Sequence, residues 1–165
     1  MESLVKNLNF KCERIEAVDG IQLTLDFLKD KLDLKNFYLN RGRLPKMGEI
    51  ACALSHYKAF ELFLKTDCQF ALILEDDVEF DPGLLNKVIA EAIEKSTLWD
   101  TLSFQLNHPG LPVKFCAIAQ SHHIVQYFGH VVETGAYLIN RKTAHIYMCD
   151  FFPISLPYDY FYNQP

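Results

Sequence analysis

The chain has 165 residues, of which half are hydrophobic and 13% aromatic, so it is long and apolar enough for one globular domain and is not a disordered segment. Its net charge of −5 and isoelectric point of about 5.6 argue against a nucleic-acid partner, because sequence-independent binding to phosphates requires a basic face. The apolar runs are far shorter than the roughly 20 residues of a membrane span, and we expect no secretory signal.

Residues 9–18, with the sequence NFKCERIEAV, predict a short strand that is closed by the turn pair Asp19-Gly20. Residues 21–47 are mixed and predict either a short helix or an irregular cover, followed by a basic loop. Residues 48–65 show the clearest helical pattern, because their apolar residues recur at spacings of three and four.

The second half of the chain alternates between strand and helix patterns. The predicted elements are a strand at 70–75, a helix opened by Asp81-Pro82, strands at 99–106, 123–128 and 134–139, and a helix capped by Asn140. This alternation predicts a single α/β domain over residues 1–165, with a central, mostly parallel sheet flanked by helices. The continuous apolar run at 70–75 is typical of a strand covered on both faces. Ligands of such sheets bind at the carboxyl ends of the strands.

Three consecutive carboxylates, Glu75, Asp76 and Asp77, follow the strand predicted at 70–75. Side chains of extended backbone alternate between faces, so Glu75 and Asp77 are expected on one side and Asp76 on the other. Two carboxylates at a strand end can share a divalent cation, and oxygen ligands favour Mg²⁺ or Mn²⁺ over zinc. The alternative is a solvated acidic loop, and for Asp81 a helix N-cap is the preferred interpretation.

The five cysteines are odd in number, widely spread and without a C-x-x-C pair: Cys12, Cys52, Cys68, Cys116 and Cys149. This pattern favours reduced thiols over a disulfide framework or a zinc site, so we expect a cytoplasmic protein.

Three segments, GEIACALSHYKAF, ALILEDDVEFDP and TGAYLINRKTA, resemble successive motifs of glycosyltransferase family 25, which includes bacterial lipooligosaccharide galactosyltransferases. With ERIEAVDG before them and PISLPYDYF after them, the resemblance covers roughly residues 13–162. It implies a GT-A-type nucleotide-sugar-binding domain. It also implies transfer of a hexose such as galactose from a UDP-sugar to a lipooligosaccharide or lipopolysaccharide acceptor, assisted by Mn²⁺ or Mg²⁺. A lipid-linked acceptor would add at most peripheral contact with the inner membrane.

The resemblance also implies roles for particular residues. It places Glu75-Asp76-Asp77 at the Asp-x-Asp motif of GT-A enzymes, so that Asp77 would bind the metal and Glu75 would lie near the ribose or the metal's water shell. Ser55 and His56 would lie near the donor or acceptor pocket. The alternative for both is a packed helix whose polar side chains make local hydrogen bonds.

Two further pairs of residues complete the candidate site. Gly135, beside Thr134, would allow the backbone to approach a sugar closely, or else it marks a tight packing position in a central strand. Glu133 and Asp159 are the candidates for a general base, and the aromatic residues around Asp159 suit sugar recognition as well as an exposed chain end.

A basic loop is the preferred interpretation of Arg41, Arg43 and Lys46, and contacts with phosphates are the alternative. Members of the family usually begin with an additional strand and the start of a helix, of which MESLVKNL resembles the end, and they continue beyond the last residues of this chain. The resemblance therefore predicts an incomplete domain that transfers sugar poorly. A catalytically inactive remnant or a nucleotide-sugar-binding module remains open, whereas a magnesium-dependent phosphotransferase lacks a P-loop pattern.

Overall fold

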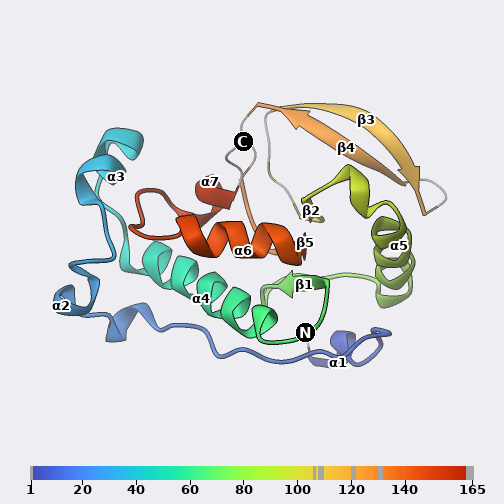
Figure 1. Cartoon of the computed structure of the whole chain (residues 1–165), viewed down its shortest axis with the longest axis horizontal. Helices are drawn as coiled ribbons and strands as arrows, with labels where there is room; N and C mark the ends of the chain where they lie inside the picture. The colour runs from blue at the N-terminus through green and yellow to red at the C-terminus, as the bar shows by residue number, and fades with distance from the viewer. Residues whose placement is uncertain (1, 106, 108–109, 120–121, 130–131, 163–165) are drawn as a thin grey trace. The chain divides into compact units, whose positions relative to one another are not determined.

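The chain folds as two units, each built from segments that are distant in the sequence (Figure 1). One unit comprises Met1–Arg14 and Phe70–Asn140, and the other comprises Ile15–Gln69 and Arg141–Pro165. The computed structural model describes residues 2–105, 107, 110–119, 122–129 and 132–162. None of the helices in these ranges is long and apolar enough to cross a membrane.

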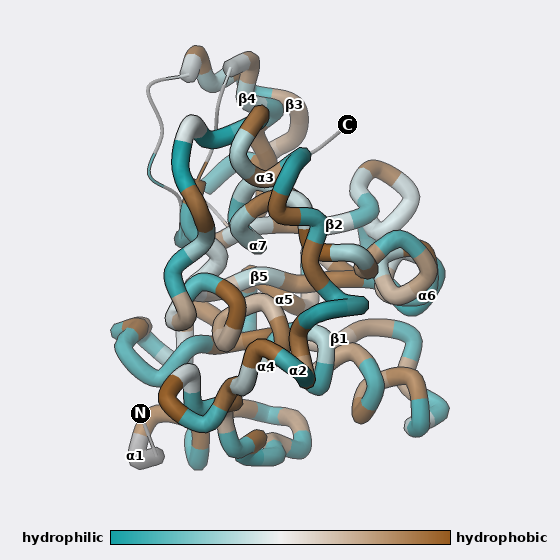
Figure 2. Tube along the Cα trace, turned by 90° about the vertical axis from the view of Figure 1, so that its left-hand side faces the viewer, coloured by the Kyte–Doolittle hydropathy of each residue, from teal (hydrophilic) through white to brown (hydrophobic). Residues whose placement is uncertain are grey.

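A three-stranded antiparallel sheet forms the centre of the first unit. Its strands are β1 (Phe70–Leu74), β5 (Ala136–Asn140) and β2 (Thr101–Ser103), in the order β1-β5-β2. β5 is the middle strand, and Leu138 lies opposite Leu72 on one side and Leu102 on the other. β5 is buried along its first four residues, and the β1 trace is hydrophobic throughout (Figure 2).

The mixed α/β class predicted from the sequence is confirmed, but the described strands pair antiparallel rather than mostly parallel. β1 and β2 do run in the same direction, since each is antiparallel to β5, and the helix α5 (Pro82–Glu94) connects them. The alternation of strand and helix therefore located a crossover connection correctly. It could not show that β5, from much later in the chain, inserts between the two strands in the opposite direction.

The helix α5 packs its apolar face against the first unit's core. Asp81 caps it by accepting a hydrogen bond from Leu84 N at 2.7 Å, and Pro82 occupies its first turn, as the sequence predicted. Ala92 lies in a cluster with Trp99 and Leu138, and the Trp99 indole donates to Ala92 O at 2.9 Å. The short helices α1 (Glu2–Val5) and η2 (Ser96–Leu98) complete the helical part of this unit.

A long hairpin of β3 (Leu111–Ile118) and β4 (His122–Phe128) lies beside α5 (Figure 1). The sequence predicted β4 but not β3. A register shift between Lys114 and Cys116 interrupts the pairing, and Ile118 and Ile124 enter the same core cluster as Trp99.

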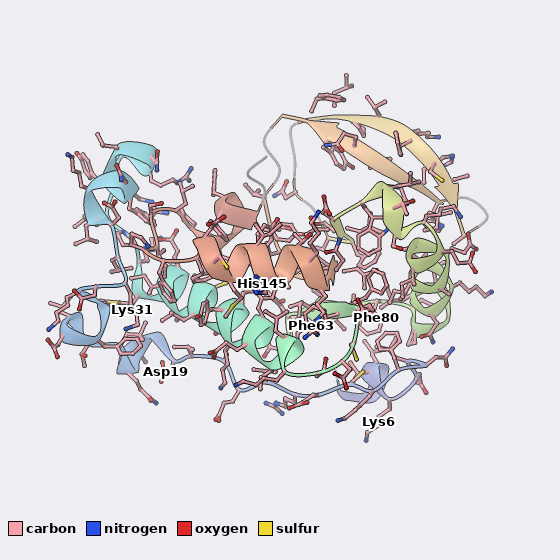
Figure 3. All side chains as sticks on the ribbon, in the orientation of Figure 1. Lys6, Asp19, Lys31, Phe63, Phe80 and His145 are labelled. Carbon is pink, nitrogen blue, oxygen red and sulfur yellow. The ribbon has the colours of Figure 1, made fainter. Side chains whose placement is uncertain are left out.

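The second unit is helical. Its elements are η1 (Gly20–Gln22), α2 (Leu25–Leu28), α3 (Leu34–Arg41), α4 (Met47–Leu64), α6 (Arg141–Asp150) and α7 (Tyr158–Tyr162). Helices α4 and α6 pack against each other, and the Arg141 guanidinium donates to the Leu64 and Thr66 carbonyls at 2.7 Å each. The guanidinium carbon also lies 5.9 Å from the ring centre of Phe63, which is buried and labelled in Figure 3.

The strand predicted at residues 9–18 does not form. In the second unit, Val18 N donates to the Ser55 hydroxyl at 2.9 Å, and Glu16 O accepts a hydrogen bond from the Lys58 ammonium at 2.8 Å. In the first unit, Asn9 N donates to the Asn86 side chain at 2.9 Å. Side chains of helices therefore satisfy these backbone groups in place of a neighbouring strand.

Candidate functional site

Polar residues from three segments meet at one end of the central sheet. The β1–β5 register ends with Leu74 opposite Ala136, and the next residue, Glu75, donates its backbone N–H to Gly135 O at 2.7 Å. On the other side of β5, Phe104 N donates to Ala136 O at 2.8 Å, which brings Gln105 to the same end. We call Glu75, Gln105, Thr134 and Gly135 the strand-end cluster. It lies at the carboxyl ends of β1 and β2, where α/β sheets commonly bind ligands.

Thr134 holds the Glu75 carboxylate in place. The Thr134 hydroxyl donates a hydrogen bond to Glu75 Oε1 at 3.2 Å, and the Thr134 side chain is only 5% exposed. Glu75 is half-buried, because its backbone already takes part in the sheet. The structure thus brings two of the predicted donor-binding residues into direct contact.

Asp76 and Asp77 form a turn rather than a continuation of β1. The expectation that side chains alternate from Glu75 to Asp77 is therefore wrong, since it requires extended backbone. Both aspartates are exposed, whereas the following residue, Val78, is 6% exposed and anchors the turn. Like charges on neighbouring residues repel each other less in water than in a buried site, which accounts for the exposed turn.

The carboxylates after β1 have the donor chemistry of the ion that the sequence predicts, but the described structure does not bring the oxygens of all three together. Glu75, Asp76 and Asp77 supply only oxygen donors, which is the ligand chemistry of Mg²⁺ and Mn²⁺. The exposed turn leaves Asp76 and Asp77 accessible to an ion that keeps water or phosphate as its other ligands. That Asp77 and Glu75 would hold such an ion therefore remains a prediction.

Gly135 leaves room for a neighbouring side chain. A Cβ atom at this position would overlap Gln105 Oε1 and lie 2.9 Å from Val78 Cγ1. Of the two roles predicted for Gly135, tight packing thus has a direct structural reason. Sequence reasoning missed Gln105, and the available signal was a polar residue at the end of the strand predicted at 99–106.

Glu133 precedes the cluster with an unusual backbone conformation. Its φ angle is 78°, in the left-handed region that few residues other than glycine adopt without strain, and its side chain is exposed. Strained residues of this kind gather at functional sites. Its assignment as a general base remains a prediction.

Ser55 and His56 belong to the second unit, on helix α4. The Ser55 hydroxyl donates to Ala51 O at 2.8 Å and accepts from Val18 N at 2.9 Å, so it ties residues 15–18 to the helix. His56 is 5% exposed and stacks on Tyr158, with ring centres 4.0 Å apart and an angle of 11° between the rings. Local packing thus accounts for both side chains, and their predicted roles in donor binding stay predictions.

Asp159 lies in the first turn of α7, next to Tyr158 in the second unit. It is half-buried, and its Oδ1 accepts a hydrogen bond from Tyr160 N at 3.0 Å. The Arg41 guanidinium lies over the Tyr160 ring, 3.8 Å from its centre. One of the aromatic residues next to Asp159 in the sequence, Tyr160, therefore carries a stacked cation.

Arg43 is bound within the second unit by the first turn of α4. Its guanidinium pairs with both carboxylate oxygens of Glu49, at 2.8 and 2.5 Å, and Glu49 Oε2 also accepts from Lys46 N at 2.8 Å. The hydrogen bond from Arg43 lowers the pKa of Glu49, although partial burial opposes this, and Glu49 in turn raises the pKa of Arg43. Arg43 thus stabilises the start of the helix, which favours the structural interpretation of the basic loop over contact with phosphates.

Comparison with known proteins gives one family. The family model described as "Glycosyltransferase family 25 (LPS biosynthesis protein)" matches residues 1–162. A protein of Drosophila pseudoobscura pseudoobscura named "Glycosyltransferase 25 family member" is 35% identical over 85 residues, which is 50% of this chain and 14% of that protein. A protein of Aedes aegypti with the same name is 34% identical over 103 residues, or 59% of this chain and 17% of that protein.

A human relative carries a different name. It is called "Inactive glycosyltransferase 25 family member 3" and is 30% identical over 94 residues, which is 53% of this chain and 16% of that protein. The chain thus spans less than a fifth of the length of these three relatives.

Proposed function

The chain belongs to glycosyltransferase family 25, and from this premise we propose that it transfers a hexose such as galactose from a UDP-sugar to a lipooligosaccharide or lipopolysaccharide acceptor. The words "LPS biosynthesis protein" in the family's description support this class of acceptor. The proposed domain is of the GT-A type, with the nucleotide sugar at the carboxyl ends of β1 and β2.

The strand-end cluster is the observation that carries the proposal. Glu75 is held by Thr134 and by the backbone of Gly135, and the two exposed aspartates follow it directly. A fixed carboxylate beside two accessible ones suits the diphosphate of a nucleotide sugar when a divalent cation is present. Bound there, Mn²⁺ or Mg²⁺ would neutralise the negative charge of the departing UDP.

The chain's own residues have distinct tasks in this proposal. Asp77 and Glu75 hold the cation, while Asp76, Thr134 and Gly135 contribute to the donor site. The roles of Ser55 and His56 in donor binding are kept as expectations from the family resemblance. As the acceptor oxygen attacks the anomeric carbon, the sugar–phosphate bond breaks and a carboxylate takes the acceptor's proton. Glu133 and Asp159 are the candidates for that carboxylate.

A second function, nucleotide-sugar binding without turnover, is supported by the names of some relatives. The human protein and its mouse counterpart are both called inactive. Such a protein would use the strand-end cluster for binding and would lack only the proton acceptor or the acceptor site.

We also propose the cytoplasm as the compartment, with at most peripheral contact with a membrane. All five cysteines lie in the described part of the chain, and none of them forms a disulfide. Nucleotide sugars and reduced thiols occur together in that compartment.

Release of UDP from UDP-galactose and UDP-glucose, with Mn²⁺ or with a chelator, tests the proposal. We expect the purified chain to bind the donor and to release UDP only with Mn²⁺. Of the variants Glu133→Gln and Asp159→Asn, the one that loses UDP release identifies the general base. Binding without release would support the second function. Absence of donor binding in the presence of Mn²⁺ would contradict both functions.

A further inference from the structure

Gln105 is the member of the strand-end cluster that neither the sequence nor the proposed function explains. It follows Phe104, whose backbone N–H binds Ala136 O, and it therefore stands beside the amino end of β5. Its side chain is exposed, yet its amide oxygen lies against Gly135. Among the residues that the structure describes, the Gln105 amide has no hydrogen-bonding partner.

We propose that Gln105 binds the hexose of the donor, and that Gly135 sets the position of its side chain. This inference rests on the proposed function. A side-chain amide offers two N–H donors and a carbonyl acceptor, which together suit neighbouring hydroxyl groups of a sugar. Glu75, one of the residues proposed to hold the cation, hydrogen-bonds through its backbone N–H to Gly135, so the amide and the carboxylate adjoin the same residue.

Gly135 acts on Gln105 through space rather than through a bond. A Cβ atom at position 135 would occupy the place of the Gln105 amide oxygen, so alanine there would displace the amide. Because Gln105 is a flexible, exposed residue at a strand end, its displacement should leave the fold intact. The same Cβ atom would lie 2.9 Å from Cγ1 of buried Val78, so Val78 must shift as well, and Gly135→Ala should lower stability somewhat in addition to altering recognition of the sugar.

A comparison of UDP with UDP-hexose shows whether Gln105 and Gly135 act on the sugar or on the nucleotide. UDP carries the diphosphate and the base but no hexose, whereas a UDP-hexose carries all three. A residue that contacts only the sugar changes affinity for the UDP-hexose and leaves affinity for UDP unchanged. A purely structural residue would change both affinities together.

The experiment measures the affinities of UDP and UDP-galactose, with Mn²⁺, for the full chain carrying Gln105→Ala, Gly135→Ala or both substitutions. Gln126→Ala is the control, since Gln126 is also an exposed glutamine of the first unit, on strand β4. We expect Gln105→Ala to weaken UDP-galactose binding about three- to tenfold, as for the loss of one or two hydrogen bonds, with UDP binding unchanged. Gly135→Ala should weaken it at least as much in the otherwise native chain and have a smaller effect beside Gln105→Ala, where only the shift of Val78 remains.

Four outcomes would overturn the inference. If the native chain binds UDP-galactose and Gln105→Ala binds it equally well, Gln105 does not contact the sugar, although the proposed function stands. Equal losses for UDP and UDP-galactose would show that Gln105 acts on the nucleotide or on the fold. Equal effects of Gly135→Ala with and without Gln105 would exclude the orienting role of the glycine. Failure of the native chain to bind either ligand would overturn the proposed function, and the inference with it.

Discussion

The Thr134 hydroxyl donates a hydrogen bond to Glu75 Oε1 across 59 residues of sequence. It joins the residue that follows β1 to the segment that enters β5, at the point where the β1–β5 register ends. Since Thr134 is buried and β5 is the middle strand, this contact fixes the direction of the carboxylate from the rigid part of the sheet. Groups held in this way do not have to be reorganised when a ligand binds.

Thr134→Val should remove this contact while keeping the shape of the side chain. We expect the free energy of unfolding to fall by about 1 kcal/mol and the Mn²⁺-dependent affinity for UDP to fall with it, because Glu75 loses its orientation. Chemical denaturation and calorimetry would measure the two effects. Thr134→Ser, which keeps the hydroxyl, should retain most of the affinity, and a serine variant as weak as the valine variant would contradict the role of the hydrogen bond.

Glu133→Gly should stabilise the protein, because glycine adopts the observed φ of 78° without the strain of a side chain. We expect the free energy of unfolding to rise by about 1 kcal/mol, as measured by denaturation. Glu133→Gln keeps both the side chain and the strain, so its stability should remain near that of the native chain. If Glu133 is the proton acceptor, both variants lose transfer activity, whereas an active glutamine variant would assign that role elsewhere.

Acid should weaken the second unit through Glu49. The hydrogen bond from Arg43 lowers the pKa of Glu49 from its ordinary value of 4.5 in the folded chain. A group with a lowered folded pKa stabilises the protein above its unfolded pKa, and this stability is lost as pH falls through the folded pKa. We therefore expect stability to decline below about pH 4.5, and Glu49→Gln to reduce the slope of that decline.

Denaturation midpoints between pH 3 and pH 6 would test this, since the stability of the variant should depend less on pH than that of the native chain. Asp26→Asn is a suitable control, because Asp26 pairs with Lys29 while 88% of its side chain is exposed. Parallel pH profiles of the native chain and Glu49→Gln would contradict the assignment to Glu49.

The sequence predicts features that local patterns determine. The apolar run of β1, the capping of α5 by Asp81 and the helical spacing of α4 all depend on neighbouring residues, and all three are confirmed. The carboxylate cluster was likewise expected at a strand end. Glu75 lies beside Thr134 and Gly135 because β1 pairs with β5. The resemblance places both segments in the candidate site but does not show that the two strands pair.

The features that were missed depend on contacts between distant segments. Nothing in the sequence of β5 shows that it inserts antiparallel between β1 and β2, because a middle strand has the same apolar pattern in either direction. The strand β3 was not predicted, and its Pro112 weakens the strand pattern, although a hairpin edge tolerates proline. Gln105 reaches the site through the pairing of the residues after β2 with β5, and its amide oxygen lies against Gly135.

The central claim is that the carboxylates at the end of β1 form a cation-dependent site for a nucleotide diphosphate. Calorimetry of UDP binding to the native chain, Asp77→Asn and Asp81→Ala, each with and without Mn²⁺, tests it most directly. Asp81 is the matched control because it is another exposed aspartate of the same segment, and its side chain caps α5.

We predict that the native chain binds UDP only with Mn²⁺ and that Asp77→Asn loses this binding. The free energy of unfolding of Asp77→Asn should be unchanged or slightly higher than that of the native chain, since one of three adjacent negative charges is removed. Asp81→Ala should lose about 1 kcal/mol of stability with its helix cap and still bind UDP with Mn²⁺. Equal Mn²⁺-dependent affinity in Asp77→Asn and the native chain would contradict the claim and leave Asp77 as part of a solvated turn.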